Sequence, residues 1–325
     1  MIDRRAFLGT LVLAVAAAPL RSAAQAPAKV VRLGVLVFGA RPADSNLPRL
    51  LEALRDLGYA EGRNLAIEYR YAQGKPERLP ELAADLVRLK PDVIFAAGGD
   101  VARYAKEATR TIPIVVATSD DPVESGLVAS FARPGGNITG LTFLISDLAG
   151  KRLEMFREIV PKVTKVALLH NPDHPDPELR ETQAAARAFG VQIVVLEARR
   201  PGEIDAMLQA LSGQRAEALI VVSSRLTAVH QQNIVRFAED NRLPLITGWG
   251  PWAEGGALLA YGPNTGEIVR RAALYIDKIV KGAWPGDLPV ERPTKFELVI
   301  NVRTAERLGL TVPPSLLLRA DRVIQ

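Results

Sequence analysis

Residues 92–117 read DVIFAAGGDVARYAKEATRTIPIVVA, a stretch that is typical of one strand–helix–strand unit. Its two ends, Asp92–Ala97 and Ile112–Ala117, are short and apolar, and the amphipathic segment Val101–Thr109 lies between them. Two strands that are joined through a helix in this way lie parallel in one sheet. The stretch therefore predicts an α/β fold, with parallel sheets flanked by helices.

The same alternation extends over most of the chain. Toward the N-terminus we expect strands and helices, in turn, at Arg32–Phe38, Leu47–Leu57, Leu65–Tyr71 and Pro76–Leu89. A second series repeats the whole order at Lys165–His170, Pro177–Phe189, Val191–Leu196, Pro201–Leu211, Ala218–Val222, Ala228–Asp240 and Pro244–Thr247. Because 325 residues are many for one domain, the repeat predicts two similar lobes.

We expect the two lobes to exchange segments. Lobe 1 is assigned 30–145 and about 255–283, and lobe 2 is assigned 146–254 and about 284–325. A few linking segments let such lobes close on each other like a clamshell. The hinge candidates are Phe143–Asp147, Trp249–Gly255 and Trp284–Pro293.

The segment 1–26 has the order of an export signal. Arg4 and Arg5 precede an uncharged run over 6–20, and small residues follow at 22–26. The run is shorter than the roughly 20 apolar residues that span a bilayer, so we expect a cleaved signal, and the paired arginines resemble a twin-arginine signal. The chain has no cysteine, so it is not expected to be a lipoprotein. The predicted location is the periplasm.

Composition excludes several other functions. The chain has 41 basic and 36 acidic residues, and this small excess is spread along it, which gives no basis for nucleic-acid binding. The lack of cysteine excludes disulfides, thiolate metal sites and a cysteine nucleophile.

The loops that follow the predicted strands are small and polar, and they are the candidate site. In open parallel sheets, ligands bind beyond the carboxyl ends of the strands. Two lobes that face each other bring both sets of loops into one cleft. The candidate ligand-binding residues are Phe38, Gly98, Gly99, Asp100, Ser119, Asp121, Asn171, Ser224, Arg225, Trp249 and Tyr261.

Some of these residues have more than one interpretation. Gly98 and Gly99 let a ligand approach the amides that open a helix. Asp100 either caps that helix or contacts the ligand. Arg225 either holds a ligand carboxylate bidentately or lies exposed at a helix start, and Trp249 falls where an indole ring can stack on a planar ligand.

The chain carries no complete catalytic or metal-binding motif. Asp120 and Asp121 are either a carboxylate pair for acid–base chemistry or a turn that contacts the ligand. His170 and His174 lie in a proline-stiffened loop, which argues against a metal site. We therefore expect no enzyme activity, no catalytic residue, no metal and no cofactor. An exported hydrolase that uses Asp120 or Asp121 is an alternative.

Short strings along nearly the whole chain are shared with a known family. They are GYAEGRNL at 58–65, PDVI at 91–94, TIPIV at 111–115, DPV at 121–123, RPGGNITGL at 133–141, NP at 171–172, LVIN at 298–301 and AERLGLTVP at 305–313. The chain resembles the periplasmic substrate-binding components of ABC transporters. Within them it is similar to the family of tryptophan- and other aromatic-amino-acid-binding proteins.

The resemblance implies a type I periplasmic-binding fold and an ABC permease in the cytoplasmic membrane as partner. It implies a cleft lined by Asp121, Asn171 and the residues after Val222, with an amino acid or another small organic solute as ligand. Amino-acid-binding members typically carry hydroxyl side chains where this chain has Gly98, Gly99 and Asp100. The ligand identity therefore stays open.

The expected function is that of an extracytoplasmic solute-binding component of an ABC-type uptake transporter. It binds its ligand, as a monomer, through hinge closure, and closure requires that the ligand prefer the shut form to the open one. A periplasmic ligand sensor that docks on a membrane receptor is an alternative that uses the same cleft.

Overall fold

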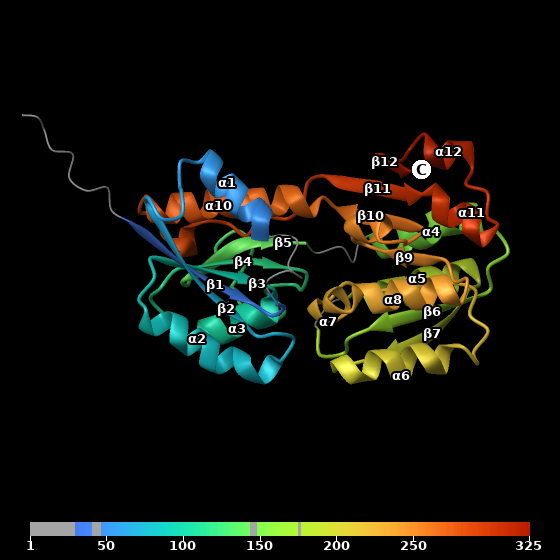
Figure 1. Cartoon of the computed structure of the whole chain (residues 1–325), viewed down its shortest axis with the longest axis horizontal. Helices are drawn as coiled ribbons and strands as arrows, with labels where there is room; N and C mark the ends of the chain where they lie inside the picture. Colours follow the sequence, from blue (N-terminus) through green and yellow to red (C-terminus); the bar gives the residue numbers. More distant parts are fainter. Residues whose placement is uncertain (1–29, 41–46, 144–147, 175–176) are drawn as a thin grey trace, which may run out of the picture.

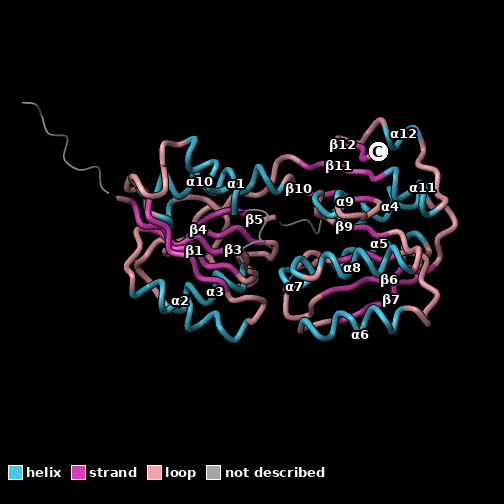
Figure 2. Tube along the Cα trace, viewed as in Figure 1, coloured by secondary structure: helices cyan, strands magenta, loops and turns pink. Residues whose placement is uncertain are grey.

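The computed structural model describes residues 30–40, 47–143, 148–174 and 177–325, and these form two lobes that lie side by side (Figure 1; Figure 2). The expected export signal, 1–26, lies outside the described residues, as do residues 144–147 of the first hinge candidate. None of the helices in the described ranges is long and apolar enough to cross a membrane.

Lobe 1 is a parallel sheet with helices on both faces. In order across the sheet, its strands are β2 (Leu65–Tyr71), β1 (Val31–Val37), β3 (Val93–Ala97), β4 (Ile114–Thr118) and β5 (Ile138–Thr142). The helices α1 (Leu47–Asp56) and α10 (Thr265–Val280) cover one face, and α2 (Leu79–Arg88) and α3 (Gly99–Ala108) cover the other (Figure 1). A short 3-10 helix, η2 (Pro76–Arg78), leads into α2. Because both faces are covered, the central strands are apolar along nearly their whole length.

Lobe 2 is a larger sheet that is covered in the same way. In order across the sheet, its strands are β12 (Arg322–Ile324), β11 (Phe296–Asn301), β10 (Leu259–Pro263), β9 (Leu245–Thr247), β8 (Leu219–Val221), β6 (Lys165–His170) and β7 (Gln192–Glu197). One face packs against α4 (Ala149–Ile159), α5 (Glu178–Phe189), α11 (Val302–Leu308) and α12 (Pro314–Leu317). The other packs against α6 (Pro201–Leu211), α7 (Arg225–Val229), α8 (Gln231–Asp240) and α9 (Pro251–Glu254).

The two sheets share one topology. The order β7-β6-β8-β9-β10 in lobe 2 repeats β2-β1-β3-β4-β5 in lobe 1, and these strands pair in parallel. The predicted α/β fold with two similar lobes is confirmed. Lobe 2 also contains an antiparallel strand, β11, that the repeat did not predict. It pairs with β10, and Leu259 lies opposite Ile300. Among the described residues of lobe 1, no strand corresponds to it.

The chain crosses between the lobes at places that differ from the boundaries expected at 255 and 284. Strand β10 belongs to the sheet of lobe 2, so the second crossing follows Pro263. After α10 the chain stays in lobe 1, where Val290 is buried and the Glu291 carbonyl accepts a hydrogen bond from the Thr142 amide at 2.9 Å. The third crossing therefore follows Glu291. The hinge candidate Trp249–Gly255 is wrong, because α9 lies wholly in lobe 2.

Lobe 2 contains a buried ion pair between its first two helices. Arg152 of α4 and Glu178 of α5 are hydrogen-bonded to each other, and their side chains are 1% and 0% exposed. Arg152 also donates a hydrogen bond to the carbonyl of Tyr261 on β10, at 3.2 Å. The pair thus joins two helices to the strand through which the chain leaves the lobe.

Candidate functional site

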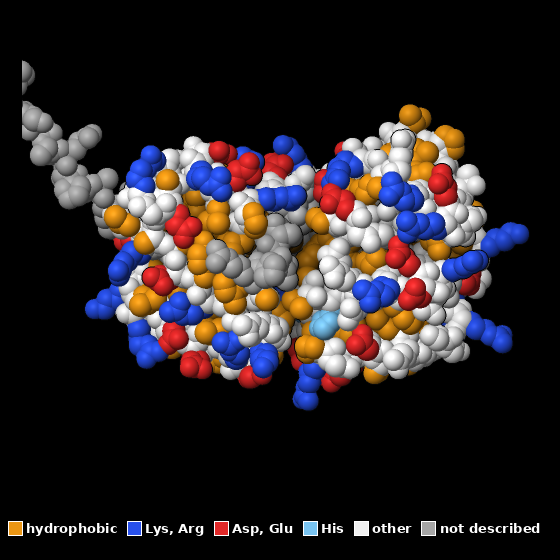
Figure 3. Space-filling view, viewed as in Figure 1, with side chains coloured by type: hydrophobic (Ala, Val, Ile, Leu, Met, Phe, Trp, Pro, Cys, Tyr) orange, Lys and Arg blue, Asp and Glu red, His pale blue; other side chains and the backbone are white. Residues whose placement is uncertain are grey.

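A pocket of about 150 Å³ lies between the two lobes, at the carboxyl ends of β1, β3 and β4. Figure 3 shows the hollow between the lobes, where hydrophobic side chains gather. Residues of lobe 1 that line it are Val37, Phe38, Gly39, Leu47, Phe95, Ala97, Gly98, Ala117, Ser119, Phe143, Thr265 and Val269. Residues of lobe 2 that line it are Arg225, Ala228, Val229, Gln231, Trp249, Pro251 and Trp252.

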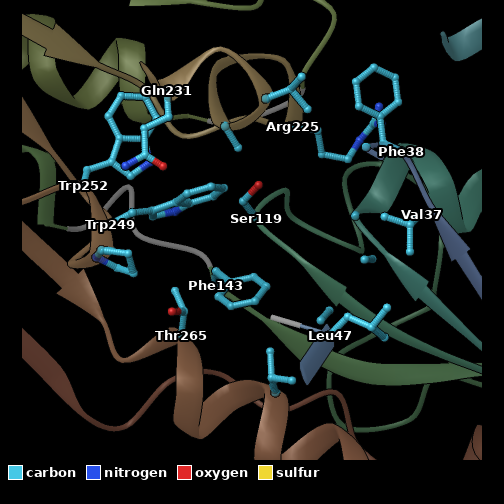
Figure 4. A pocket seen from close by; sticks show the side chains of 18 of the residues that line it. Val37, Phe38, Leu47, Ser119, Phe143, Arg225, Gln231, Trp249, Trp252 and Thr265 are labelled. Carbon is cyan, nitrogen blue, oxygen red and sulfur yellow. The ribbon is translucent and has the colours of Figure 1, made fainter. Parts of the chain in front are cut away.

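Aromatic side chains form much of the pocket wall. Phe38, Phe95 and Phe143 come from lobe 1, and Trp249 and Trp252 come from lobe 2. Trp249 projects into the space between the lobes, with Phe143 on one side of it (Figure 4). Trp252 is only 2% exposed and also packs in the core of lobe 2, so it supports the wall that it lines. Walls of this kind suit a flat aromatic ring, which stacks on them or meets them edge to face.

Arg225 of α7 spans the cleft and contacts lobe 1 twice. Its Nε and Nη2 atoms pair with the two carboxylate oxygens of Asp100 on α3. Its guanidinium carbon lies 4.0 Å from the centroid of the Phe38 ring. Burial lowers the pKa of Arg225 to about 9, so the group stays charged at neutral pH. Asp100 pairs with this cation, and its Oδ1 atom also accepts a hydrogen bond from the Val101 amide in the first turn of α3, at 3.1 Å, although the N-cap position of that helix is Gly98.

Two buried donors at the pocket have no acceptor among the described residues. They are Nη1 of Arg225 and Nε1 of Trp249. Both atoms are shielded from solvent in this arrangement, and a buried donor without a partner costs about 1–3 kcal/mol. A ligand that places oxygen acceptors at these two positions would satisfy both donors.

A second polar contact between the lobes involves Ser119 and His174. The Ser119 hydroxyl, at the end of β4, lies 3.0 Å from Nε2 of His174, which belongs to the loop after β6. Burial lowers the pKa of His174 from 6.5 to about 4, so its imidazole is neutral at neutral pH.

We expect ligand affinity to fall as the pH decreases from 6.5 toward 4. Opening of the lobes exposes His174 and returns its pKa to the ordinary value, so protonation favours the open form in this range. Above pH 6.5 the imidazole is neutral in both forms, and no dependence on His174 is expected. Calorimetric titrations over this range test the prediction, with His174→Asn as the non-titrating control. A wild-type profile that matches the His174→Asn profile contradicts it.

The predicted residues divide into two groups. Those that line the pocket are Phe38, Gly98, Ser119, Arg225 and Trp249. Asp100 does not line it but forms an ion pair with Arg225. The others have local partners: Asp121 accepts hydrogen bonds from two amides of the following turn, and Asn171 accepts one from the amide two residues later. Ser224 is the N-cap of α7, Gly99 is the first residue of α3, and the ring of Tyr261 packs against the core of lobe 2. None of this second group lines the pocket.

The described part of the chain contains no group of three or more His, Cys, Asp or Glu residues placed to hold a metal ion. The Oδ1 atom of Asp121 accepts hydrogen bonds from the amides of Val123 and Glu124, at 2.8 and 3.1 Å, which is the geometry of a turn. Of the two interpretations of this residue, the turn is therefore the one that the local geometry matches.

Several lining residues were missed because they do not lie in a predicted strand-end loop. Leu47 is the first residue of α1, Gln231 is the first residue of α8, and Thr265 and Val269 belong to α10. Phe143 follows β5, a strand that was not predicted. Their place at the start of a helix could have indicated them, because the first turn of a helix that packs on a sheet lies near the strand ends.

A family model and a sequence relative match most of the chain. The model of the family described as ABC transporter substrate binding protein matches residues 34–324. A tyrosine-binding protein of Clostridioides difficile (strain R20291) is 27% identical over 262 residues, which are 80% of this chain and 75% of that protein.

Two solved structures show the same fold. A conserved domain protein from Vibrio cholerae is 29% identical, has a TM-score of 0.84, and the match covers 91% of this chain and 100% of that one. The ABC domain in complex with L-Trp from Streptococcus pneumonia is 23% identical, has a TM-score of 0.83, and the match covers 90% of this chain and 99% of that one. The fold is the predicted type I periplasmic-binding fold. Since the family model spans nearly all of the described chain, the protein belongs to the ABC transporter substrate-binding protein family and is a solute-binding protein.

Proposed function

We propose that the protein captures a small molecule with an aromatic ring in the pocket between its lobes, and that it does so without chemical conversion. The observation that carries this proposal is the aromatic lining, which both lobes contribute at the strand ends. A cleft between two lobes with an apolar wall and few polar groups is the usual form of a small-molecule site.

The size of the pocket supports a ligand with a single ring system. Its volume is about 150 Å³, and an apolar cavity of about 150 Å³ holds a benzene molecule. Trp249 from lobe 2 and Phe38 and Phe143 from lobe 1 can contact such a ring from different sides. The relative from Clostridioides difficile, which is named a tyrosine-binding protein, also supports an aromatic ligand.

Closure of the lobes creates a conformation that a permease can recognise. The Arg225–Asp100 pair and the Ser119–His174 contact form only when the lobes face each other closely. A ligand that contacts both lobes binds this form better than the open one, and this difference shifts the equilibrium. The proposed role is delivery of the ligand, by a monomer exported to the periplasm, to an ABC permease in the cytoplasmic membrane.

Thermal-shift screening of the purified protein tests the proposal. The panel contains aromatic acids, aromatic amino acids, aliphatic amino acids, sugars and nucleosides. A ligand that binds only the folded state raises Tm by mass action. We expect aromatic compounds to raise Tm and aliphatic compounds of similar charge to leave it unchanged. Stabilisation by sugars or aliphatic amino acids alone contradicts the proposal.

Trp249→Ala should weaken binding of the aromatic ligand about tenfold, because the ring loses a stacking partner worth about 1–1.5 kcal/mol. Trp284→Ala is the matched control, since Trp284 is 49% exposed and does not line the pocket. Isothermal titration calorimetry measures both variants. If Trp249→Ala and Trp284→Ala bind equally well, the ring does not lie against Trp249.

A further inference from the structure

We infer that the ligand is an aromatic carboxylate without an ammonium group, an inference that rests on the proposed function. The pocket has charged and donor groups that are specific for the ligand's polar groups. They determine which polar groups on the ligand find a partner once the lobes close.

One edge of the Arg225 guanidinium is free to bind a ligand. Asp100 pairs with Nε and Nη2 of the guanidinium, which leaves Nη1 with both of its N–H groups. Stacking on Phe38 fixes the plane of the group and therefore the direction of these donors. A carboxylate accepts charge-assisted hydrogen bonds from such an edge, and these are roughly twice as strong as bonds between neutral groups. Arg225 is thus built to receive an anion while its other edge is held.

An amino-acid ligand would bring an ammonium group as well as a carboxylate into the pocket. An α-ammonium group that is taken out of water needs a carboxylate or several acceptors. No Asp or Glu is among the described residues that line the pocket, and the carboxylate of Asp100 is paired with Arg225. Among the described residues, a buried ammonium group at this pocket therefore lacks a counter-charge, whereas a carboxylate has one in Arg225.

The indole of Trp249 supplies a further donor at the pocket. Nε1 of Trp249 is buried without an acceptor, and the Ser119 hydroxyl is engaged by His174. The unsatisfied groups at this pocket are thus an N–H of an indole and an N–H edge of a guanidinium. Both groups are hydrogen-bond donors, so the ligand must supply oxygen acceptors to them and not donors.

Matched pairs of ligands test the inference by calorimetry at neutral pH. The pairs are 3-phenylpropanoate with L-phenylalanine, 3-(4-hydroxyphenyl)propanoate with L-tyrosine, and indole-3-propanoate with L-tryptophan. The members of each pair differ only in the α-ammonium group. We expect the acid without that group to bind at least about 30-fold more tightly, because the ammonium group would be buried unpaired.

The outcomes separate the inference from the proposed function. If the amino acids bind as tightly as the acids or more tightly, the inference is overturned and the aromatic pocket stands. If no aromatic compound of either kind binds, the proposed function itself fails. A neutral analogue, 3-phenylpropanamide, tests the charge, and affinity equal to that of the acid also overturns the inference.

The variant Arg225→Met then tests whether Arg225 binds the carboxylate of the ligand. We expect the preference for acid over amide to fall from about tenfold to near unity, since the charge-assisted bonds are lost. Arg157→Met is the control, because Arg157 also stacks on an aromatic ring, at 4.8 Å from the Phe189 centroid, but lies outside the pocket. If Arg225→Met weakens acid and amide by the same factor, Arg225 has only a structural role and the inference is overturned.

Discussion

Gly98→Ala should weaken ligand binding by about 100-fold, which corresponds to about 2.7 kcal/mol. Gly98 has φ of +112° and is the N-cap of α3, and a Cβ atom at this position would overlap the Cδ atom of Arg225 and lie 3.1 Å from its Nε. Arg225 belongs to the other lobe, so the added methyl group pushes the lobes apart. The loss should appear in the affinity for any ligand that needs the closed form.

The control for this prediction is Gly58→Ala. Gly58 has φ of +91°, and no heavy atom lies within 4 Å of the position where its Cβ would be. Alanine there carries a similar backbone strain, of about 1–3 kcal/mol, without touching lobe 2. Calorimetry should therefore show weaker binding only for Gly98→Ala, while denaturant unfolding shows comparable destabilisation of both variants. Wild-type affinity in Gly98→Ala contradicts the closed arrangement.

Glu178→Leu should lower the free energy of unfolding by about 3–5 kcal/mol, because it leaves the buried guanidinium of Arg152 without its counter-charge. Neither side chain of this pair reaches solvent appreciably, with exposures of 1% for Arg152 and 0% for Glu178. Urea unfolding followed by circular dichroism measures the change. Because Arg152 also holds the Tyr261 carbonyl, lobe 2 should loosen next to its second crossing to lobe 1.

Two variants make this prediction specific. Glu154→Leu breaks an exposed pair with Lys151, with side chains 47% and 42% exposed, and should cost at most about 1 kcal/mol. The double variant Arg152→Met with Glu178→Leu replaces the pair by apolar groups and should recover most of the loss. If Glu178→Leu is as stable as the wild type, the pair does not hold the lobe together.

Much of the fold follows from local sequence pattern. The strands β1 and β6 are short, mostly apolar runs, and both were predicted to within one residue. One helix was expected over Ala228–Asp240, whereas the structure has α7 and α8, which meet at His230. The capping box formed by Ser224 and Thr227 starts α7 early, and this needs side-chain geometry that the hydrophobic period does not show.

The third crossing and the antiparallel strand β11 depend on long-range packing. The segment after α10 stays in lobe 1 because Val290 is buried there, and it then returns to the edge of the sheet in lobe 2. A strand that enters a sheet from the opposite end runs antiparallel to its neighbour. Nothing in the local sequence of Phe296–Asn301 indicates from which end the chain arrives.

The candidate site was predictable where residues directly follow strands. Phe38, Ser119 and Trp249 come after β1, β4 and β9, so the strand-end rule places them at the pocket. The pairing of Asp100 with Arg225 was not predictable, since the two residues are 125 positions apart and lie in different lobes. Their contact depends on how the lobes face each other.

The distance between the lobes, measured with and without ligand, tests the account most directly. The chain has no cysteine, so spin labels on Glu107→Cys in α3 and Asn233→Cys in α8, both exposed positions, report only the movement between lobes. With the tightest aromatic carboxylate at saturation, double electron–electron resonance should show a shorter and narrower distance distribution than without ligand. An unchanged distribution, in the presence of binding that calorimetry confirms, would contradict capture of the ligand between the lobes.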